Sequence, residues 1–310
     1  MKKKGISSQI QIKIGKTVGI IFIVVAVIVG LVVNASITDA NNTELTLESE
    51  SAAYQLSDFF NQYCTIAEQL TTNQDIQHYL ETTLVYEDVV VNENFADVMK
   101  TLDTIQSLHP ETIQGVFVGD ADADGLIMSG DYVSEKGWDM KSRPWYAATE
   151  LGHTMLTEPY VDVNTGGMVL TISTPVYNSA GNLLGVAGMD IALDDIVTTV
   201  SQYKIGESGF VALLSSDGMF IYHPTSESIG TYISDMDASK ELIDAVLNKQ
   251  HTFLKYNVNG DPKFGCVATV GDTGYVVISC IESAEYYQSI VMIGAMLLGV
   301  FAIGIVIIIL

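Results

Sequence analysis

Three short segments between residues 143 and 190 carry side chains suited to binding a small zwitterion. They are Arg143-Pro-Trp145-Tyr146, Tyr160-Val-Asp162 and Gly188-Met-Asp190. A free amino acid needs a cation and N–H or O–H donors for its carboxylate, and carboxylates for its ammonium, because charge-assisted hydrogen bonds are the stronger ones. Arg143, Trp145 and Tyr146 can serve the carboxylate. Asp162 and Asp190 can serve the ammonium, while the aromatic rings exclude water.

The same residues also fit ordinary structural roles. Trp145 and Tyr146 on a short helix are often core residues, and Arg143 with Asp162 could form a surface ion pair of small energetic value. Asp190 is harder to explain in this way, because it closes an otherwise apolar strand, where a carboxylate is costly unless it is paired or solvated. From the residues alone, a binding site and a structural cluster both remain open.

A second candidate site is the acidic turn Asp120-Ala-Asp122-Ala-Asp124-Gly125, which is followed by Asp131. Its oxygen ligands at positions 1, 3 and 5, its glycine at 6 and its acid at 12 have the spacing of an EF-hand calcium loop. The flanking residues, however, indicate strands rather than the helices that this motif requires. A hairpin turn is the preferred interpretation, with calcium as the alternative. No zinc-ligand spacing is present, and no cofactor is expected.

Two uncharged apolar runs, residues 17–33 and 290–310, bracket all 37 acidic residues. Roughly 20 apolar residues in a helix span a bilayer core, so both runs are predicted to cross the membrane. Lysines but no acids precede the first run, which places the N-terminus in the cytoplasm. A cleaved signal peptide is the alternative for that run, which exceeds the usual length of such a segment. The second run ends the chain, and we expect a cytoplasmic portion to follow it.

The segment between the two runs is strongly acidic. Residues 36–286 contain nine Lys and Arg residues against 37 Asp and Glu residues, a formal charge of −28. Such a surface keeps a domain soluble and disfavours nucleic acid or anionic lipid as a partner. The odd number of cysteines, which are Cys64, Cys266 and Cys280, does not indicate a disulfide framework. Small buried thiols are the preferred interpretation, with a Cys266–Cys280 pair as the alternative.

Hydrophobic periodicity divides the external segment into helices followed by strands. Residues 38–82 contain neither Gly nor Pro, and their apolar residues recur at helical spacing. This pattern predicts a long helix that continues out of the membrane, followed by a second helix over residues 95–108. From residue 112, a strand, an Asp-Gly turn, a second strand, a helix and longer antiparallel strands occur twice in that order. Two similar α+β domains in tandem are therefore predicted.

The segments from Arg143 to Asp190, together with GESGFVALLSSDGMFIYHP at residues 206–224, resemble the double-Cache (dCache) extracellular sensor domains of bacterial transmembrane receptors. The similarity is greatest to those of methyl-accepting chemotaxis proteins and covers most of residues 36–310. It implies an α+β fold with a long N-terminal helix and two tandem PAS-like (Cache) antiparallel-sheet domains, bracketed by two transmembrane helices. It also implies a homodimer with the long helix as its seam.

Part of that family recognises amino acids through a residue pattern that this sequence largely matches. The matching residues are Arg143, Trp145, Tyr146, Tyr160, Asp162 and Asp190. By this resemblance the first three contact the ligand carboxylate, and the two aspartates hold its ammonium. Phe117 stands where the pattern expects a tyrosine, so the ring is present without its hydroxyl. This difference implies lower affinity or altered specificity.

These features divide the chain into six expected segments. Residues 1–16 are expected to form a cytoplasmic tail and residues 17–35 the first transmembrane helix. Residues 36–110 are a long extracellular helical stalk, residues 111–203 a membrane-distal ligand-binding Cache domain, and residues 204–282 a membrane-proximal Cache domain. Residues 283–310 are the second transmembrane helix.

The predicted function is that of a plasma-membrane receptor that binds an amino acid outside the cell and transmits a conformational signal inward, with chemotaxis as the favoured output. A histidine kinase or a cyclic-dinucleotide enzyme is the alternative output. An ectoenzyme is not favoured, because the G-x-S-x-G and H-E-x-x-H motifs and a convincing Cys/His pair are absent from the sequence. A protein-binding ectodomain without a small ligand is the remaining alternative, which a collapsed distal pocket would support.

Overall fold

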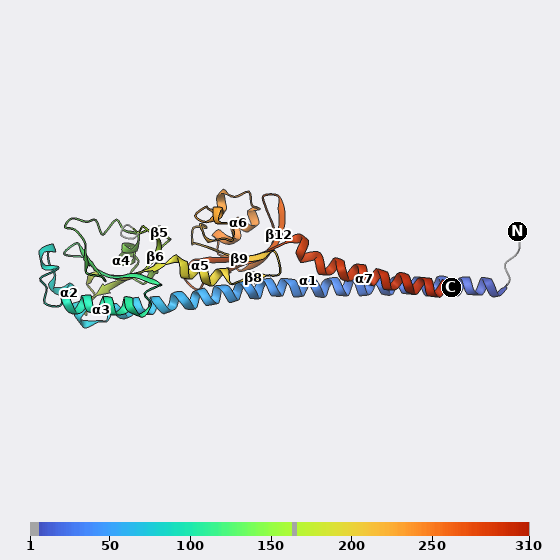
Figure 1. The fold of residues 1–310 in the computed structure, drawn as a ribbon, viewed down its shortest axis with the longest axis horizontal. Coiled ribbons are helices and arrows are strands. Elements are labelled where there is room, and N and C mark those ends of the chain that lie inside the picture. Colours follow the sequence, from blue (N-terminus) through green and yellow to red (C-terminus); the bar gives the residue numbers. More distant parts are fainter. Residues whose placement is uncertain (1–5, 163–165, 310) are drawn as a thin grey trace.

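The computed structural model describes residues 6–162 and 166–309. Its axis is helix α1 (Ile6–Thr71), whose 66 residues run along almost the whole molecule (Figure 1). At about 1.5 Å per residue such a helix is about 100 Å long. Two antiparallel sheets lie along the C-terminal half of α1, and helix α7 (Ser283–Ile309) lies along the other half. The result is a rod with two sheets on one side.

The part of α1 beside the sheets is amphipathic, as its sequence predicts. Its buried side chains recur at intervals of three, four or seven residues and include Leu45, Ala52, Leu56, Phe60, Tyr63, Ala67 and Leu70. The prediction of one helix through residue 82 is wrong at one point, because α1 ends at Thr71 and α2 (Gln74–Thr82) follows it. The Oδ1 atom of Asn73 accepts hydrogen bonds from the N–H groups of Asp75 (2.9 Å) and Ile76 (3.1 Å), which caps the new helix.

We call the sheet farther from the N-terminus of α1 the distal sheet. Its strands are β1 (Ile113–Asp120), β2 (Gly125–Met128), β3 (Tyr132–Val133), β4 (Met155–Leu156), β5 (Tyr160–Val161), β6 (Met168–Tyr177) and β7 (Leu183–Ala192). Their order is β3-β2-β1-β7-β6-β4, with β5 also paired to β6, and every pair is antiparallel. The helical elements of this region are η1 (Tyr86–Asp88), α3 (Phe95–Leu108), η2 (Pro144–Tyr146) and α4 (Ala147–Leu151).

Alternation along the strands divides the side chains of the distal sheet between two faces. Val116 and Val118 of β1 belong to the core that includes α1. Phe117, which lies between them, belongs instead to a separate cluster with Val186 and Trp145. The face away from α1 is therefore covered by η2 and α4, and it is the face that is available for a ligand.

The second sheet, which we call the proximal sheet, repeats this arrangement. Its strands are β8 (Lys204–Ile205), β9 (Gly209–Leu214), β10 (Phe220–Tyr222), β11 (Thr252–Val258), β12 (Asp261–Thr269) and β13 (Val276–Glu282), in the order β10-β9-β13-β12-β11 with β8 paired to β9. Val277 packs into the core that includes α1, whereas Ile278 packs with Leu242 of α6 (Lys240–Leu247). The predicted α+β class with a long N-terminal helix and antiparallel sheets is confirmed. Cys266 and Cys280 are buried free thiols, and Cys64 is a half-buried one.

The two sheets are connected by α5 (Leu193–Ser201) and by a direct contact between the β4–β5 segment and the start of β13. The hydroxyl of Tyr275 donates a hydrogen bond to the carbonyl oxygen of Thr157 at 2.7 Å. The hydroxyl of Ser216 donates another to the carboxylate of Glu158. Tyr275 is fully buried, and its ring packs edge-on against Phe60 of α1 with centroids 5.6 Å apart. This junction joins both sheets and the shared helix.

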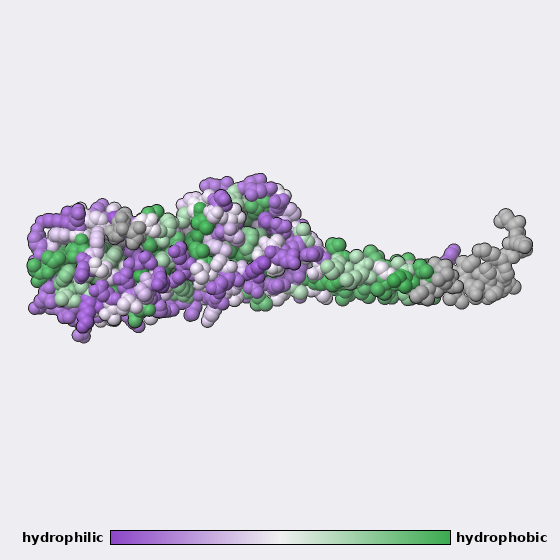
Figure 2. All heavy atoms as spheres, in the orientation of Figure 1, coloured by the Kyte–Doolittle hydropathy of each residue, from purple (hydrophilic) through white to green (hydrophobic). Residues whose placement is uncertain are grey.

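Helix α7 follows β13 directly and runs beside α1 (Figure 1). Near the proximal sheet, the Asn41 side-chain amide donates to the carbonyl oxygen of Tyr286 at 2.8 Å, and the Tyr286 hydroxyl donates to Asn42 Oδ1 at 2.5 Å. Farther along, the rings of Phe22 and Phe301 meet edge-on at 5.9 Å. Figure 2 shows that this end of the molecule is hydrophobic, and both helices are long and apolar enough to cross a membrane. The predicted apolar helices at both ends are confirmed.

Removing a buried leucine of α1 is expected to destabilise the molecule. Leu56 is fully buried in the core that α1 forms with the sheets, so Leu56→Ala should lower the free energy of unfolding by about 2–5 kcal/mol through lost burial and the cavity left behind. Leu47→Ala is the matched control, because Leu47 lies on the same helix and is 58% exposed; it should change stability by less than about 0.5 kcal/mol. Thermal unfolding of the full chain in detergent micelles measures both, and equal effects would contradict the assigned burial.

Candidate ligand-binding site

A cavity lies on the face of the distal sheet that is turned away from α1. Its volume is about 30 Å³, well below the roughly 300–1,000 Å³ of small-molecule sites, so its walls must separate for a ligand to enter. Its walls are Phe117, Leu126, Met128, Tyr132, Trp138, Arg143, Trp145, Tyr160, Asp162 and Asp190. Six of the seven residues expected from the sequence therefore line one cavity. The seventh, Tyr146, packs beside Trp145 with ring centroids 6.3 Å apart.

Asp190 lies at the centre of the cavity floor, on β7 between β1 and β6. Its cross-strand partners are Gly115 and Thr171. The Thr171 hydroxyl donates to Asp190 Oδ1 at 2.6 Å, and the Tyr160 hydroxyl lies 3.4 Å from the same oxygen. The hydroxyl oxygens of Tyr160 and Thr171 lie 2.6 Å from each other and share a hydrogen bond. The carboxylate is thus contacted by a hydroxyl group from the neighbouring strand β6 and by one from β5, which pairs with β6, and its position in the sheet determines where it points.

Burial raises the pKa of Asp190 to about 6. The side chain is only 5% exposed, and a charged carboxylate loses hydration there. The hydrogen bond from Thr171 lowers the pKa, the nearby charge of Asp162 raises it, and the hydrogen bond from Tyr160 lowers it again. Burial and the charge of Asp190 also raise the pKa of Tyr160, so its hydroxyl stays protonated. A positively charged ligand group would relieve the unfavourable burial of negative charge at this position.

Asp162 brings a second carboxylate to the same wall. It is 8% exposed and follows β5, where its N–H donates to the carbonyl oxygen of Gly167 at 2.9 Å. Two buried aspartates in one cavity repel each other unless a cation lies between them. The pair therefore forms a subsite suited to an ammonium group.

Arg143 supplies the positive charge of the cavity. It is the only arginine in the sequence, and its guanidinium carbon lies 4.7 Å from the centre of the Trp138 ring, a cation–π contact. Trp138 in turn stacks on Trp145 at 6.3 Å with an interplanar angle of 30°. Among the ion pairs formed by the described residues, none includes Arg143. The guanidinium is thus positioned by aromatic rings and retains its N–H donors for a carboxylate.

Glycines shape the floor of the cavity around the Phe117 ring. Phe117 lies opposite Gly188 on β7, and a Cβ atom at Gly188 would lie 2.7 Å from the Phe117 ring. The Phe117 ring also contacts Trp145 at a centroid distance of 4.7 Å. A larger residue at Gly188 would displace this ring pair. Packing against the Phe117 ring therefore explains why a glycine occupies this position in the Gly188-Met-Asp190 segment.

Four wall residues and one supporting residue were not expected from the sequence. The wall residues are Leu126, Met128, Tyr132 and Trp138. Trp138 could have been suspected, because a tryptophan five residues before the arginine of a short helix is well placed to pack on it. Thr171 supports Asp190 from β6, and this pairing depends on strand register, which the sequence does not specify.

The acidic turn at residues 120–125 uses its carboxylates differently from a calcium loop. Asp120 Oδ1 accepts hydrogen bonds from the N–H groups of Asp122 (2.9 Å) and Ala123 (2.8 Å). Burial raises the pKa of Asp120 to about 7, while Asp122 and Asp131 are exposed and Asp124 lies 3.9 Å from Lys141. No group of three metal-ligating side chains converges in the parts of the chain that the structure describes. The hairpin interpretation explains these contacts.

Comparison with known proteins identifies related sequences. The dCache_1 family model, described as a Cache domain, matches residues 33–290. A probable methyl-accepting chemotaxis protein of Bacillus thuringiensis is 28% identical over 217 residues, which are 66% of this chain and 31% of that protein. The methyl-accepting chemotaxis protein PctB of Pseudomonas aeruginosa is 37% identical over 100 residues, 32% of this chain and 16% of PctB. The chain thus spans less than a third of either relative.

Solved structures show the same fold at low sequence identity. The sensory domain of the Campylobacter jejuni chemoreceptor Tlp3 aligns with a TM-score of 0.63 and 18% identity, covering 81% of this chain and 97% of that one. The ligand-binding domain of the Pseudomonas fluorescens chemoreceptor CtaA in complex with L-isoleucine aligns with a TM-score of 0.61 and 20% identity. This alignment covers 82% of this chain and 98% of the CtaA chain. The PctB ligand-binding domain in complex with L-Arg aligns with a TM-score of 0.57 and 21% identity. This alignment covers 77% of this chain and 94% of the PctB chain.

The raised pKa of Asp190 generates a pH prediction. The folded protein holds this proton more tightly than the unfolded chain, whose pKa is near 3.8. The resulting stabilisation is fully present below about pH 4 and is lost as the pH rises through about 6, a change of about 3 kcal/mol. Without ligand, the unfolding temperature of the wild type should therefore fall relative to Asp190→Asn between pH 4 and 7. Exposed Asp194 provides the control, Asp194→Asn. A pH-independent difference between wild type and Asp190→Asn would refute the assignment.

Proposed function

The chain belongs to the dCache_1 family of Cache domains, and we propose that it is the sensory region of a transmembrane chemoreceptor that binds an amino acid in the distal cavity. The observation that carries this proposal is the convergence of Asp162, Asp190 and Arg143 on one cavity whose other walls are largely aromatic. A free amino acid carries one group for each charge. The convergence of Asp162 and Asp190 on one cavity argues against a partner-protein ligand, and an amino acid must widen this small cavity to enter.

The proposed ligand contacts follow from the chemistry of the wall. The ammonium group occupies the subsite of Asp162 and Asp190, and the carboxylate binds the Arg143 guanidinium, which matches carboxylate geometry. Both hydroxyl contacts to Asp190 found among the described residues involve Oδ1, which leaves Oδ2 for the ligand. The absence of a hydroxyl at Phe117 removes one donor and leaves an apolar contact. The site holds its ligand and performs no bond chemistry on it.

The remaining assignments are proposed on the same basis. Residues 111–203 form the ligand-binding module and residues 204–282 the membrane-proximal one, with residues 1–16 in the cytoplasm and both sheets outside the plasma membrane. Leu47 and Tyr54 of α1 lie seven residues apart and are 58% and 74% exposed. This spacing places them on one face of the helix and supports a homodimer with α1 at its seam. Chemotaxis is the proposed output.

The signal route begins at Tyr160, which touches Asp190 in the site. The same segment includes Thr157, whose hydroxyl accepts a hydrogen bond from the Thr171 N–H at 2.9 Å and whose carbonyl oxygen accepts one from Tyr275. Tyr275 directly precedes β13, which leads without a loop into α7. Closure of the β4–β5 segment on a ligand would therefore move β13 and then α7 relative to α1. A ligand can shift the balance between the open and the closed state only by the difference between its affinities for them, which is typically worth about 1–3 kcal/mol.

Amino acids are expected to stabilise the protein against heat. A ligand at a hundredfold excess over its Kd adds about 2.7 kcal/mol to the free energy of unfolding. A thermal-shift screen of the full chain against the common L-amino acids should therefore find one or a few that raise the unfolding temperature. Asp190→Ala should abolish the shift because the ammonium loses its partner, while Asp194→Ala, on an exposed neighbour, should retain it. A screen with no response from any amino acid would overturn the proposal, and a response to calcium alone would redirect it to the acidic turn.

Tyr275→Phe is expected to separate binding from signalling. The change removes the hydrogen bond to Thr157 and keeps the buried ring, so amino acid affinity should stay within about twofold of wild type. The ligand-induced change in the distance between spin labels on α1 and α7, measured by pulsed electron paramagnetic resonance, should shrink. Tyr203→Phe is the control, because its hydroxyl makes only a 3.4 Å contact with Ser51 at the surface. An unchanged distance response in Tyr275→Phe would exclude this route.

A further inference from the structure

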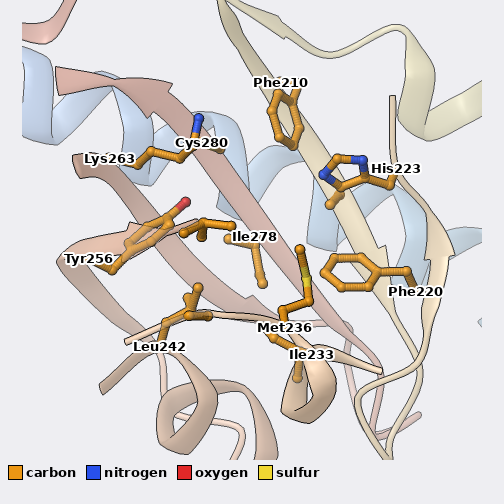
Figure 3. Close-up of a pocket in the computed structure, with 13 residues that line it drawn as sticks. Phe210, Phe220, His223, Ile233, Met236, Leu242, Tyr256, Lys263, Ile278 and Cys280 are labelled. Atoms are coloured by element: carbon orange, nitrogen blue, oxygen red, sulfur yellow. The ribbon is translucent and has the colours of Figure 1, made fainter. Parts of the chain in front are cut away.

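The proximal sheet has a cavity of its own, on the face turned away from α1 (Figure 3). Its volume is about 60 Å³, about twice that of the distal cavity. Most of the wall is apolar and includes Phe210, Phe220, Ile233, Met236, Leu242 and Ile278. Nothing in the proposed amino acid site uses these residues. This volume is below the roughly 300–1,000 Å³ of small-molecule sites, so the wall must open for an organic ligand to enter.

A few polar groups interrupt this apolar wall. Lys263 of β12, Tyr256 of β11 and Cys280 of β13 lie on one side in Figure 3, and His223, which follows β10, lies on the other. Burial raises the pKa of Cys280 and of Tyr256, so both stay neutral. The wall thus offers hydrogen-bond donors and one cation. No Asp or Glu is among the residues that line it in the described parts of the chain.

Lys263 is a half-buried cation in an acidic domain. No carboxylate oxygen lies within 4.0 Å of its ammonium among the described residues, although Glu282 is its cross-strand neighbour on β13. Other lysines of the described residues also lack an ion pair, so what distinguishes Lys263 is its position on the wall of an apolar cavity. An ammonium group at an apolar cavity without such a partner is suited to an anionic ligand group.

His223 is held in one orientation and one tautomer. Its ring lies edge-on to Phe210 and Phe220, with centroids 4.9 and 5.4 Å away. The N–H of Thr225 donates to Nδ1 at 3.0 Å. Burial lowers the pKa of His223, the hydrogen bond from the Thr225 N–H raises it, and the charge of Lys263 lowers it again, so that the pKa lies below its usual value. In the neutral ring Nε2 therefore carries the proton and acts as a donor.

We propose that this cavity binds a small monocarboxylic acid with a branched aliphatic or aromatic body. The carboxylate is bound by the Lys263 ammonium and the His223 N–H, and the body occupies the apolar interior. The same wall discriminates against amino acids, because the ammonium of a zwitterion would find no carboxylate there. The two cavities of the molecule thus select different ligands, zwitterions in the distal one and simple organic acids in the proximal one.

The position of the cavity connects it to α7. Ile278 and Cys280 line it from β13, the strand that continues directly into α7. A ligand that packs against these side chains acts on the same strand that receives the distal contact through Tyr275. The proximal ligand would therefore modulate the receptor without entering the amino acid site.

The test uses 4-methylpentanoate, which differs from L-leucine only by lacking the ammonium group. Binding to the full chain in detergent micelles is measured by isothermal titration calorimetry, with phenylacetate as an aromatic probe and 4-methylpentan-1-ol as the uncharged one. We expect both acids to bind and the alcohol to bind more weakly. Lys263→Met should weaken the acids about 10- to 100-fold, because a charge-assisted contact is lost while the side-chain volume is kept.

Two controls separate this site from the rest of the molecule. Lys255→Met removes a lysine from neighbouring β11 whose ammonium lies over the Phe264 ring, and Phe264 belongs to the core on the α1 side; this variant should bind 4-methylpentanoate as the wild type does. Asp190→Ala should also bind it normally. The proposal is overturned if the wild type binds neither acid, if Lys263→Met binds them as tightly as the wild type, if the alcohol binds equally well, or if Asp190→Ala abolishes binding.

Discussion

Both sheets bury one face against the same continuous helix, and this shared burial determines where a ligand can bind. Side chains alternate along a strand, so packing Val116 and Val118 on α1 forces Phe117 to the other face. A register shift of one residue would exchange the faces and bury the polar set against the helix. In the proximal sheet, Val277 and Ile278 divide in the same way. The cavities are therefore a consequence of how the core is built.

Within this common arrangement the two cavities differ in what their floors carry. The distal floor has a carboxylate on a central strand, which costs free energy that the hydroxyls of Thr171 and Tyr160 offset only in part, as the raised pKa of Asp190 shows. Among the described residues, the wall of the proximal cavity includes no Asp or Glu, and its cation is the half-buried Lys263 of β12. A buried charge that is unfavourable without ligand is stabilised when a ligand of opposite charge binds. The site therefore binds oppositely charged ligands in preference to neutral ones.

The sequence predicted those elements whose signals are local. Strands β6 and β7 and helix α3 were identifiable because turn residues and periodicity mark their ends. The residue types of Arg143, Asp162 and Asp190 made them candidates for one site, and the family resemblance favoured it. The two-residue strands β3, β4, β5 and β8 carry too few residues for a periodic signal. The break of the long helix depends on a single cap at Asn73. The pairing of Thr171 with Asp190, and the presence of His223 and Lys263 on the wall of one cavity, depend on strand register and tertiary contact, which no local pattern contains.

The junction between strand and helix would let a ligand of the proposed kind, in either cavity, influence the two apolar helices. Glu282 ends β13 and Ser283 begins α7, so no flexible loop absorbs a displacement of the strand. The start of α7 is held to α1 through Tyr286, whose ring stacks on Phe264 at 3.9 Å and whose hydroxyl contacts Asn42. A tightly packed contact of this kind responds by changing between discrete arrangements rather than by bending. In the proposed mechanism, small movements of β13 would therefore change how α7 lies on α1, because the strand, the shared helix and α7 meet at that contact.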